Sequence, residues 1–234
     1  MHLLLIRHGE SFVNLDDWTG GFVDAGLTPL GQRQAESVAR WMAANLHLDA
    51  LYTSTMARTL ETAAPIAQEM GLTAMADDRL REFGNCYADG RPVPPEAMPI
   101  IYPEGWWGTE FPYTCMEGGF ESWMQFRVRV SAFLDELVQQ YGAKDAPEPV
   151  IAVVCHGGVI DAVFDFVFNI GPRRMAEVWT HNTGIVHWQY LPQSSREKWR
   201  LHAHGLVHHL TNGEHEWLGS KPMLRSAARQ IEGP

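Results

Sequence analysis

The sequence predicts a three-layer α/β/α fold with a mostly parallel central sheet that carries helices on both faces. Residues 3–6 and 149–155 are short, nearly continuous apolar runs bounded by polar residues, as expected of strands buried on both faces. Segments with helical spacing alternate with these runs along the chain. The composition, with 45% hydrophobic and 20% charged residues, is that of an ordinary globular protein, and we expect one domain over residues 1–234.

The first predicted strand ends abruptly in polar residues. Its apolar run is too short to span a membrane and lacks a secretory cleavage pattern. Arg7 and His8 follow directly. In open α/β sheets ligands bind at the carboxyl ends of the strands, so both residues are candidates for a binding site.

A helix is predicted to start after Thr28, because a threonine cap followed by Pro29 is a typical helix start. Apolar residues then recur at helical spacing: Ala35, Val38, Ala39, Met42 and Leu46. Residues 51–54 predict a second strand. A helix to about residue 70 should follow, capped by Ser54 or Thr55 and bent at Pro65.

Residues 85–119 interrupt this alternation with a stretch dense in proline, glycine and aromatic residues. It is too apolar for a free linker. We interpret residues 85–121 as an insertion that forms a lid or a pocket wall and sets substrate specificity.

Helical spacing returns over residues 120–141, and the apolar strand 149–155 ends in His156 and Gly157. Residues 185–190 and 199–204 predict a strand hairpin at one sheet edge. The tail, residues 205–234, shows no clear period.

Composition excludes several partner classes. The net charge of −10 and the lack of a basic run argue against nucleic acid. Cys86, Cys115 and Cys155 are odd in number and widely spaced, which argues against a disulfide framework or a CxxC metal site and fits the cytoplasm. No membrane partner is expected, because no lipidation motif or long apolar stretch is present. The oligomeric state stays open, with a homodimer among the alternatives.

Two predicted strands each end in a histidine followed by glycine: His8 and His156. A sheet that brings both ends to one edge would place the imidazoles side by side. Backbone N–H groups at Gly157, where a helix opens, can bind an anion. Arg7 and Arg58 offer forked donors that match phosphate oxygens. Each residue alone is more often structural, and only their combination predicts a phosphoryl site.

Five blocks of sequence together resemble the histidine phosphatase superfamily, the phosphoglycerate mutase-like proteins. They are RHGES with Asn14, GFVDAGLTPLGQRQA, YTSTMARTLETA, LREFG and VVCHGGVI. Their order and approximate spacing match over roughly residues 1–84 and 149–190. The resemblance implies that family's fold and a phosphoryl-transfer activity.

The resemblance also implies residue roles. His8 corresponds to the nucleophile that becomes phosphohistidine, and Arg7, Arg58 and His156 to the pocket for the phosphoryl oxygens. Glu82, in LREFG, corresponds to the general acid that protonates the leaving oxygen and then, once ionised, activates water.

Two asparagines are further candidates by resemblance. Asn14 corresponds to a residue that helps to bind the phosphoryl group, and Asn182 falls near a family asparagine, which suggests a substrate contact.

The expected chemistry requires neither metal nor cofactor. Arg7, Arg58 and a protonated His156 would stabilise the charge on the phosphoryl oxygens. The same cations should keep His8 unprotonated and nucleophilic.

Three functions remain after this reading: a phosphomonoesterase, a phosphoglycerate mutase, and a non-catalytic member that binds phosphorylated ligands. The first is favoured, with a small, weakly charged monoester as substrate. The charges of residues 85–121 suggest this, because a single cation, Arg91, stands against six carboxylates: Asp89, Glu96, Glu104, Glu110, Glu117 and Glu121. A negative wall of this kind should repel the polyanions that a mutase must hold.

The insertion also carries aromatic residues that either contact substrate or fill a small core of their own: Trp106, Trp107, Phe111 and Tyr113. Arg173 and Arg174 are interpreted as a solvated helix start. The histidines at positions 202, 204, 208, 209 and 215 are not assigned to a metal site. His202 and His204 would share a strand face, but no cysteine or carboxylate pair completes a recognisable site.

Overall fold

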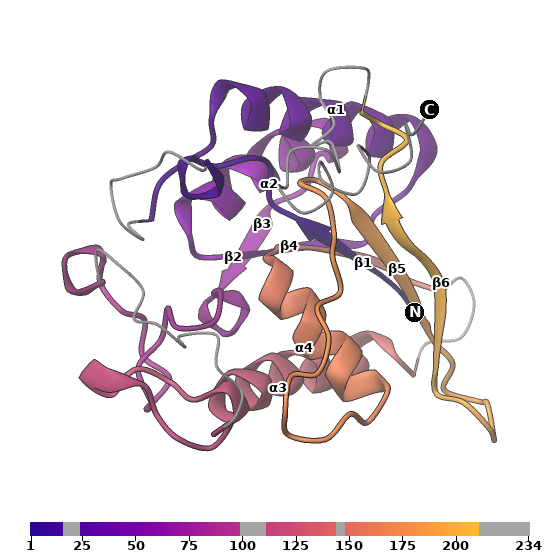
Figure 1. Cartoon of the computed structure of the whole chain (residues 1–234). Helices are drawn as coiled ribbons and strands as arrows, with labels where there is room; N and C mark the ends of the chain where they lie inside the picture. Colours follow the sequence, from indigo (N-terminus) through magenta and orange to yellow (C-terminus); the bar gives the residue numbers. More distant parts are fainter. Residues whose placement is uncertain (16–23, 99–110, 144–147, 211–234) are drawn as a thin grey trace, which may run out of the picture.

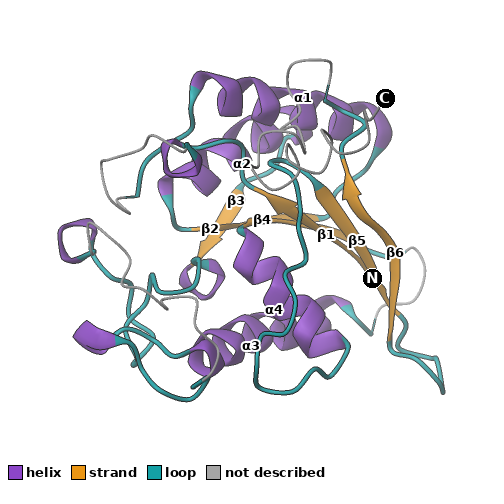
Figure 2. Cartoon of the chain, in the orientation of Figure 1, coloured by secondary structure: helices purple, strands orange, loops and turns teal. Residues whose placement is uncertain are grey.

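The computed structural model describes residues 1–15, 24–98, 111–143 and 148–210. A six-stranded sheet lies between two pairs of helices (Figure 1). Helices α1 (Pro29–Asn45) and α2 (Ala57–Met70) cover one face, and α3 (Trp123–Tyr141) and α4 (Gly157–Val167) cover the other (Figure 2). The predicted three-layer fold is confirmed.

The sheet has the order β3-β2-β4-β1-β5-β6. Its strands are β1 (His2–Arg7), β2 (Ala50–Ser54), β3 (Ala74–Asp77), β4 (Val150–Cys155), β5 (Ile185–Tyr190) and β6 (Trp199–Leu206). The first four are parallel, while β5 and β6 form the predicted antiparallel hairpin at one edge.

The register of β1 and β4 places the two predicted histidines at one edge. Arg7 pairs with Cys155 at the last position of both strands, and the His8 N–H donates to the Cys155 carbonyl at 2.9 Å. His8 and His156 therefore leave neighbouring parallel strands at the same end.

Alternating residues of β1 bury their side chains in two separate cores. Leu3 and Leu5 pack into the core shared with α3 and α4, and Leu4 and Ile6 into the core shared with α1 and α2. Burial on both faces explains why this strand reads as a continuous apolar run.

The predicted helix starts are partly correct. Thr28 caps α1, since its side chain accepts from the Gly31 N–H at 3.1 Å. The cap predicted for the next helix, Ser54 or Thr55, is wrong, because Met56 is the residue that precedes α2. The Thr55 hydroxyl donates to Asp78 instead, and the Ser54 hydroxyl lies against His156. Strand β3 was missed, since its four residues, AMAD, include no β-branched or aromatic residue and none is fully buried.

The described parts of the 85–121 segment lie against the α3 side of the molecule. Residues 87 and 120 form an isolated bridge, and their rings stack at 5.8 Å. Val93 and Phe120 join the core on that side. Residues 99–110, and the tail from residue 211, lie outside the described residues, so the lid and the single domain remain predictions.

None of the described helices has the length and apolar character that crossing a membrane requires.

Candidate active site

A cavity of about 480 Å³ opens at the carboxyl ends of β1 and β4. Its lining includes six residues predicted from the sequence: Arg7, His8, Asn14, Arg58, Glu82 and Gly157. These residues come from four separate segments of the chain, and the sheet edge brings them together.

His8 is 3% exposed, and both of its ring nitrogens have partners. Arg58 donates its Nε–H to His8 Nε2 at 3.2 Å. Nε2 must therefore carry the lone pair, and Nδ1 carries the proton that it donates to the Gly9 carbonyl at 2.7 Å. Burial, with Arg58 and Arg7 nearby, holds the pKa of His8 well below its usual value. The ring is neutral, as predicted, and burial is the largest single cause, ahead of either arginine.

The glycine after His8 makes room for the start of helix α1. A Cβ on Gly9 would lie 2.6 Å from the Gly31 carbonyl oxygen at the start of α1. Gly9 therefore allows helix α1 to approach the loop after β1, rather than a ligand to approach the backbone.

The two predicted arginines are held in different ways. Arg7 donates to the Thr180 carbonyl at 2.6 Å and lies over the Trp179 ring at 5.2 Å. Arg58 is 5% exposed and lies 3.8 Å from an Asp24 carboxylate oxygen. The positive charge of each guanidinium group is therefore partly balanced by neighbouring groups at the wall of the cavity.

His156 is fully buried, with its ring 5.2 Å from that of His8. Its Nε2 lies 2.9 Å from Ser54 Oγ, and its Nδ1 has no hydrogen-bond partner among the described residues. Burial, and then Arg58 and His8, hold the pKa of His156 well below its usual value. Burial beside an arginine therefore disfavours the protonated ring here. The protonated His156 expected to face a phosphoryl group stays a prediction.

Glu82 occupies the amino end of α4. Its Oε2 accepts from the Gly158 N–H at 3.2 Å, a position where a helix favours a carboxylate. A Cβ on Gly158 would collide with that carboxylate, whereas one on Gly157 would meet nothing within 4 Å. The Gly158 amide thus binds Glu82, while Gly157, the glycine expected to bind an anion, lines the cavity.

A buried ion pair holds the backbone around Glu82. Arg129 and Glu121 lie 2.7 Å apart, and Arg129 also donates to the carbonyls of Arg81 at 2.7 Å and Glu82 at 3.2 Å. Arg129 thereby links helix α3 to the segment that carries the predicted acid.

The two predicted asparagines lie in different places. Asn14 lines the cavity, and its Oδ1 accepts from the Ser11 N–H and hydroxyl, each at 3.0 Å. Asn182 is 1% exposed, does not line the cavity, and donates to the His8 carbonyl at 2.9 Å. It holds the His8 backbone from behind, whereas a substrate contact was expected. Trp106 and Trp107, the other candidates for substrate contact, lie outside the described residues.

Several cavity residues were missed by sequence reasoning. Arg174 pairs with Asp161 and lines the cavity with Glu177 and Trp179, so the interpretation of Arg174 as a solvated helix start is wrong. Asp161 follows Gly157 by four residues in α4, and this helical spacing was a usable signal. The loop that carries residues 174–179 offered no signal of its own.

The described acids of the 85–121 segment do not line the cavity. Glu121 is buried against Arg129, and Asp89 pairs with Arg91 at 2.7 Å. The negative pocket wall expected from these acids is therefore wrong for Glu121 and Asp89, because both are already paired. Glu104 and Glu110 lie outside the described residues.

Comparisons with known proteins find one family over most of the chain. The sequence model of the histidine phosphatase superfamily (branch 1) matches residues 3–204. A putative phosphoserine phosphatase 2 of Hydrogenobacter thermophilus is 28% identical over 79% of this chain and 87% of its own length. Phosphoglycerate mutase-like protein 4 of Arabidopsis thaliana is 27% identical over 89% and 86%.

A solved structure shares the fold. A mycobacterial glucosyl-3-phosphoglycerate phosphatase, in complex with VO3, superposes with a TM-score of 0.66 at 22% identity, covering 88% of this chain and 99% of that one.

Proposed function

This chain belongs to branch 1 of the histidine phosphatase superfamily, and we propose that it is a metal-independent phosphomonoesterase that works through a phosphohistidine at His8. The observation that carries the proposal is the state of that ring. His8 is neutral, with its Nε2 lone pair at the cavity and its Nδ1 proton on the Gly9 carbonyl. A neutral imidazole held in this tautomer is ready to attack phosphorus.

In the first step Nε2 of His8 forms a bond to phosphorus, and the bond from phosphorus to the leaving oxygen breaks. The imidazole becomes positively charged, and the Gly9 carbonyl stabilises it through the Nδ1–H. Arg58 shifts its donor from Nε2 to a phosphoryl oxygen, and Arg7 binds another. The two guanidinium groups supply the positive charge that a metal ion would otherwise provide.

Glu82 gives its proton to the leaving oxygen in that step. In the second step the ionised Glu82 takes a proton from water, the water oxygen bonds to phosphorus, and the N–P bond breaks. Phosphate and the original neutral His8 result. The place of Glu82 on the same cavity as His8 supports both roles.

His156 and Asn182 assist from behind. His156 is not among the residues that line the cavity, but its ring lies 5.2 Å from that of His8, so a phosphoryl group bound at His8 would favour protonation of the His156 ring through its negative charge. Asn182 fixes the His8 backbone through its carbonyl. We therefore assign Asn182 a positioning role.

The cavity lining supports a small, weakly charged monoester as substrate. Among its described residues three arginines face three carboxylates: Arg7, Arg58 and Arg174 against Glu82, Asp161 and Glu177. No surplus of cations is left for a second phosphate or several carboxylates. Val178 and Trp179 add apolar surface for an alkyl or aromatic leaving group.

The alternative function is that of a phosphoglycerate mutase. It is tested as well because one relative is a phosphoglycerate mutase-like protein of Arabidopsis thaliana. A mutase must hold a bisphosphate intermediate, which the balanced lining does not favour. A non-catalytic role is less consistent with the chain, because nucleophile, acid and both arginines are all present on one cavity.

The test is a panel of phosphomonoesters, with released phosphate as the readout, run beside an enolase-coupled assay for the interconversion of 2- and 3-phosphoglycerate. We expect phosphate release from uncharged alkyl or aromatic esters, with negligible mutase turnover even when 2,3-bisphosphoglycerate is supplied. Mutase turnover that exceeds phosphate release on the same substrate would favour the alternative. No turnover of any ester, with phosphate still bound, would favour the non-catalytic role.

A further inference from the structure

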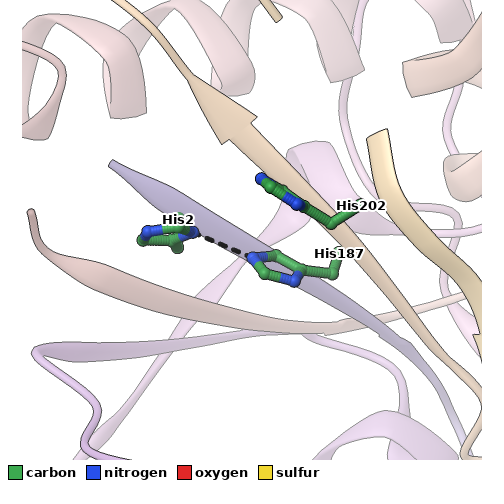
Figure 3. A group of neighbouring side chains, drawn as sticks. All are labelled: His2, His187 and His202. Carbon is green, nitrogen blue, oxygen red and sulfur yellow. Dashed lines mark hydrogen bonds between the residues drawn. The ribbon is translucent and has the colours of Figure 1, made fainter. Parts of the chain in front are cut away.

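Three histidines that lie far apart in the sequence meet at the end of the sheet remote from the cavity. His2 begins β1, His187 lies in β5 and His202 in β6, three neighbouring strands (Figure 3). His2 and Arg7 are the two ends of β1, which at ~3.3 Å per residue spans roughly 17 Å. The cluster is thus separate from the proposed active site.

The rings point toward one another. His2 Nδ1 lies 2.9 Å from His187 Nε2, and the His187 and His202 rings stack with centroids 4.7 Å apart (Figure 3). One ring nitrogen from each histidine lies within 4.8 Å of the other two. Nitrogens bound to one tetrahedral Zn²⁺ at about 2.0–2.1 Å lie roughly 3.4 Å apart, so the rings would rotate toward one another on binding the ion.

A β-bulge makes the third ligand available. The register between β5 and β6 shifts on both sides of His187, so the expected shared face of His202 and His204 is not observed. His204 instead contacts Thr180 at 3.2 Å and Phe164 at 5.8 Å, while His202 turns to His187. Sequence alternation therefore could not reveal this cluster.

Polar groups behind two of the rings match the pattern of a metal centre. The His2 Nε2 lies 3.5 Å from a Glu148 carboxylate oxygen, and the His202 Nε2 lies 2.9 Å from Gln189 Oε1. With those nitrogens protonated, Nδ1 of both rings is left with a lone pair. Carboxylates and amide oxygens commonly hold metal-binding histidines in this way.

We propose that His2, His187 and His202 form a structural binding site for Zn²⁺ or a similar divalent transition-metal ion. The ion bonds to Nδ1 of His2, Nε2 of His187 and Nδ1 of His202, and water takes the fourth position. As it binds, the hydrogen bond between His2 and His187 is replaced by two nitrogen–metal bonds, and the displaced proton moves to His187 Nδ1. Imidazole ligands suit Zn²⁺, Ni²⁺ and Cu²⁺. The bound ion would link β1 to the edge hairpin.

The test uses the full chain without a histidine tag, freed of metal with EDTA and dialysed. ZnCl₂ is titrated in by calorimetry, and Tm is followed by differential scanning fluorimetry. Because the ion binds only the folded site, a hundredfold excess over Kd should raise Tm by roughly 5–10 °C. Co²⁺ should give visible absorption bands typical of a nitrogen-ligated site.

His202→Asn is the main variant, because His202 is exposed and its loss leaves the core intact. This variant should bind one Zn²⁺ per chain fewer than wild type. Zn²⁺ should no longer raise its Tm, and Co²⁺ should no longer give the absorption bands. The matched control, His47→Asn, changes an exposed histidine outside the cluster and should behave as wild type. His8→Asn should also keep the site, which excludes binding at the proposed nucleophile. Equal zinc binding by His202→Asn and wild type, or no saturable binding by wild type, would overturn the proposal.

Discussion

Arg58 reaches His8 through a buried hydrogen bond of 3.2 Å, from its Nε–H to the His8 Nε2. The bond joins the first turn of α2 to the loop after β1, two segments that are 50 residues apart. It fixes which nitrogen of His8 carries the lone pair, and it holds a cation against the nitrogen that we propose as the nucleophile.

Replacing His8 by asparagine should abolish turnover, because no other described side chain in the cavity offers a neutral nitrogen nucleophile. The wild type should yield an acid-labile, base-stable phosphoryl adduct after brief exposure to substrate, and the variant should yield none. Circular dichroism serves as the control for folding. Full activity in the variant would contradict the phosphohistidine mechanism.

Replacing Arg58 by glutamine should lower kcat/KM by about 10²–10³, the usual cost of a lost transition-state donor. It should also change the pH profile. Arg58 lowers the pKa of His8, so its removal raises that pKa, and the acidic limb of the kcat/KM profile should move to higher pH. Arg58→Lys keeps the positive charge but not the forked donors of the guanidinium group. It should therefore return the acidic limb toward its wild-type pH more fully than it restores kcat/KM. An unchanged acidic limb in Arg58→Gln would show that His8 does not set it.

Replacing Glu82 by glutamine should slow alkyl phosphates by about 10²–10⁴, since their oxygen needs a proton to leave. A nitrophenyl ester should lose far less, because its leaving group needs little protonation. Glutamine retains an oxygen that can accept from the Gly158 N–H, so the start of α4 is preserved. Glu177→Gln, at the same cavity, is the matched control and should affect both esters alike. Equal losses for the two esters in Glu82→Gln would assign Glu82 another role.

Asp161 should make stability depend on pH between about 4 and 6. Burial raises the pKa of Asp161 to about 6 in the folded protein, despite the opposing effect of Arg174. The folded state therefore holds this proton more tightly than the unfolded chain, whose Asp has a pKa of ~3.9. The stabilising effect is complete below that value and is lost as pH rises through 6.

The comparison that isolates Asp161 is the free energy of unfolding in urea, measured at pH 4 to 7 for wild type and Asp161→Asn. The wild type should lose more stability across this window, by at most about 3 kcal/mol. Asparagine keeps an oxygen that can accept from the Val178 N–H, so the cavity loop stays in place. Parallel stability curves would show that Asp161 does not titrate in this range.

Metal removal should separate stability from activity. Chelation with EDTA should leave phosphate release unchanged, because Arg7 and Arg58 supply the charge at the active site. The same treatment should lower the Tm of zinc-loaded protein, and vanadate, which imitates the phosphoryl transition state, should inhibit. A strict requirement of turnover for added Mg²⁺ or Zn²⁺ would contradict the proposed mechanism.

Local chemistry allowed much of the fold to be predicted from the sequence. Strands β1 and β4 are recognisable because burial on both faces demands continuous apolar runs, and Thr28 with Pro29 marks the start of α1 by its capping bond. The short edge strand β3 has no such pattern, so it was missed. These features depend on neighbours along the chain, and the sequence records them directly.

The identity of the candidate site residues could also be predicted from the sequence, but their protonation, tautomers and contacts could not. Arg7, His8, Arg58 and His156 were found because each lies at a predictable strand end or in a recognisable block. The tautomer of His8, the loss of the proton from His156 and the contact of Glu82 with Gly158 come from packing. Distances and desolvation, which only the folded chain defines, decide these properties.

Contacts between remote segments depended entirely on tertiary structure. Arg174 enters the cavity because Asp161 binds it, and His202 turns to His187 because of a bulge between β5 and β6. Asn182 lies behind His8 through a bond that spans 174 residues. The sequence determined which residues could do chemistry, because residue type and local spacing encode it. The fold decided which of them meet, because strand order and register set the distances between side chains that are remote in the chain.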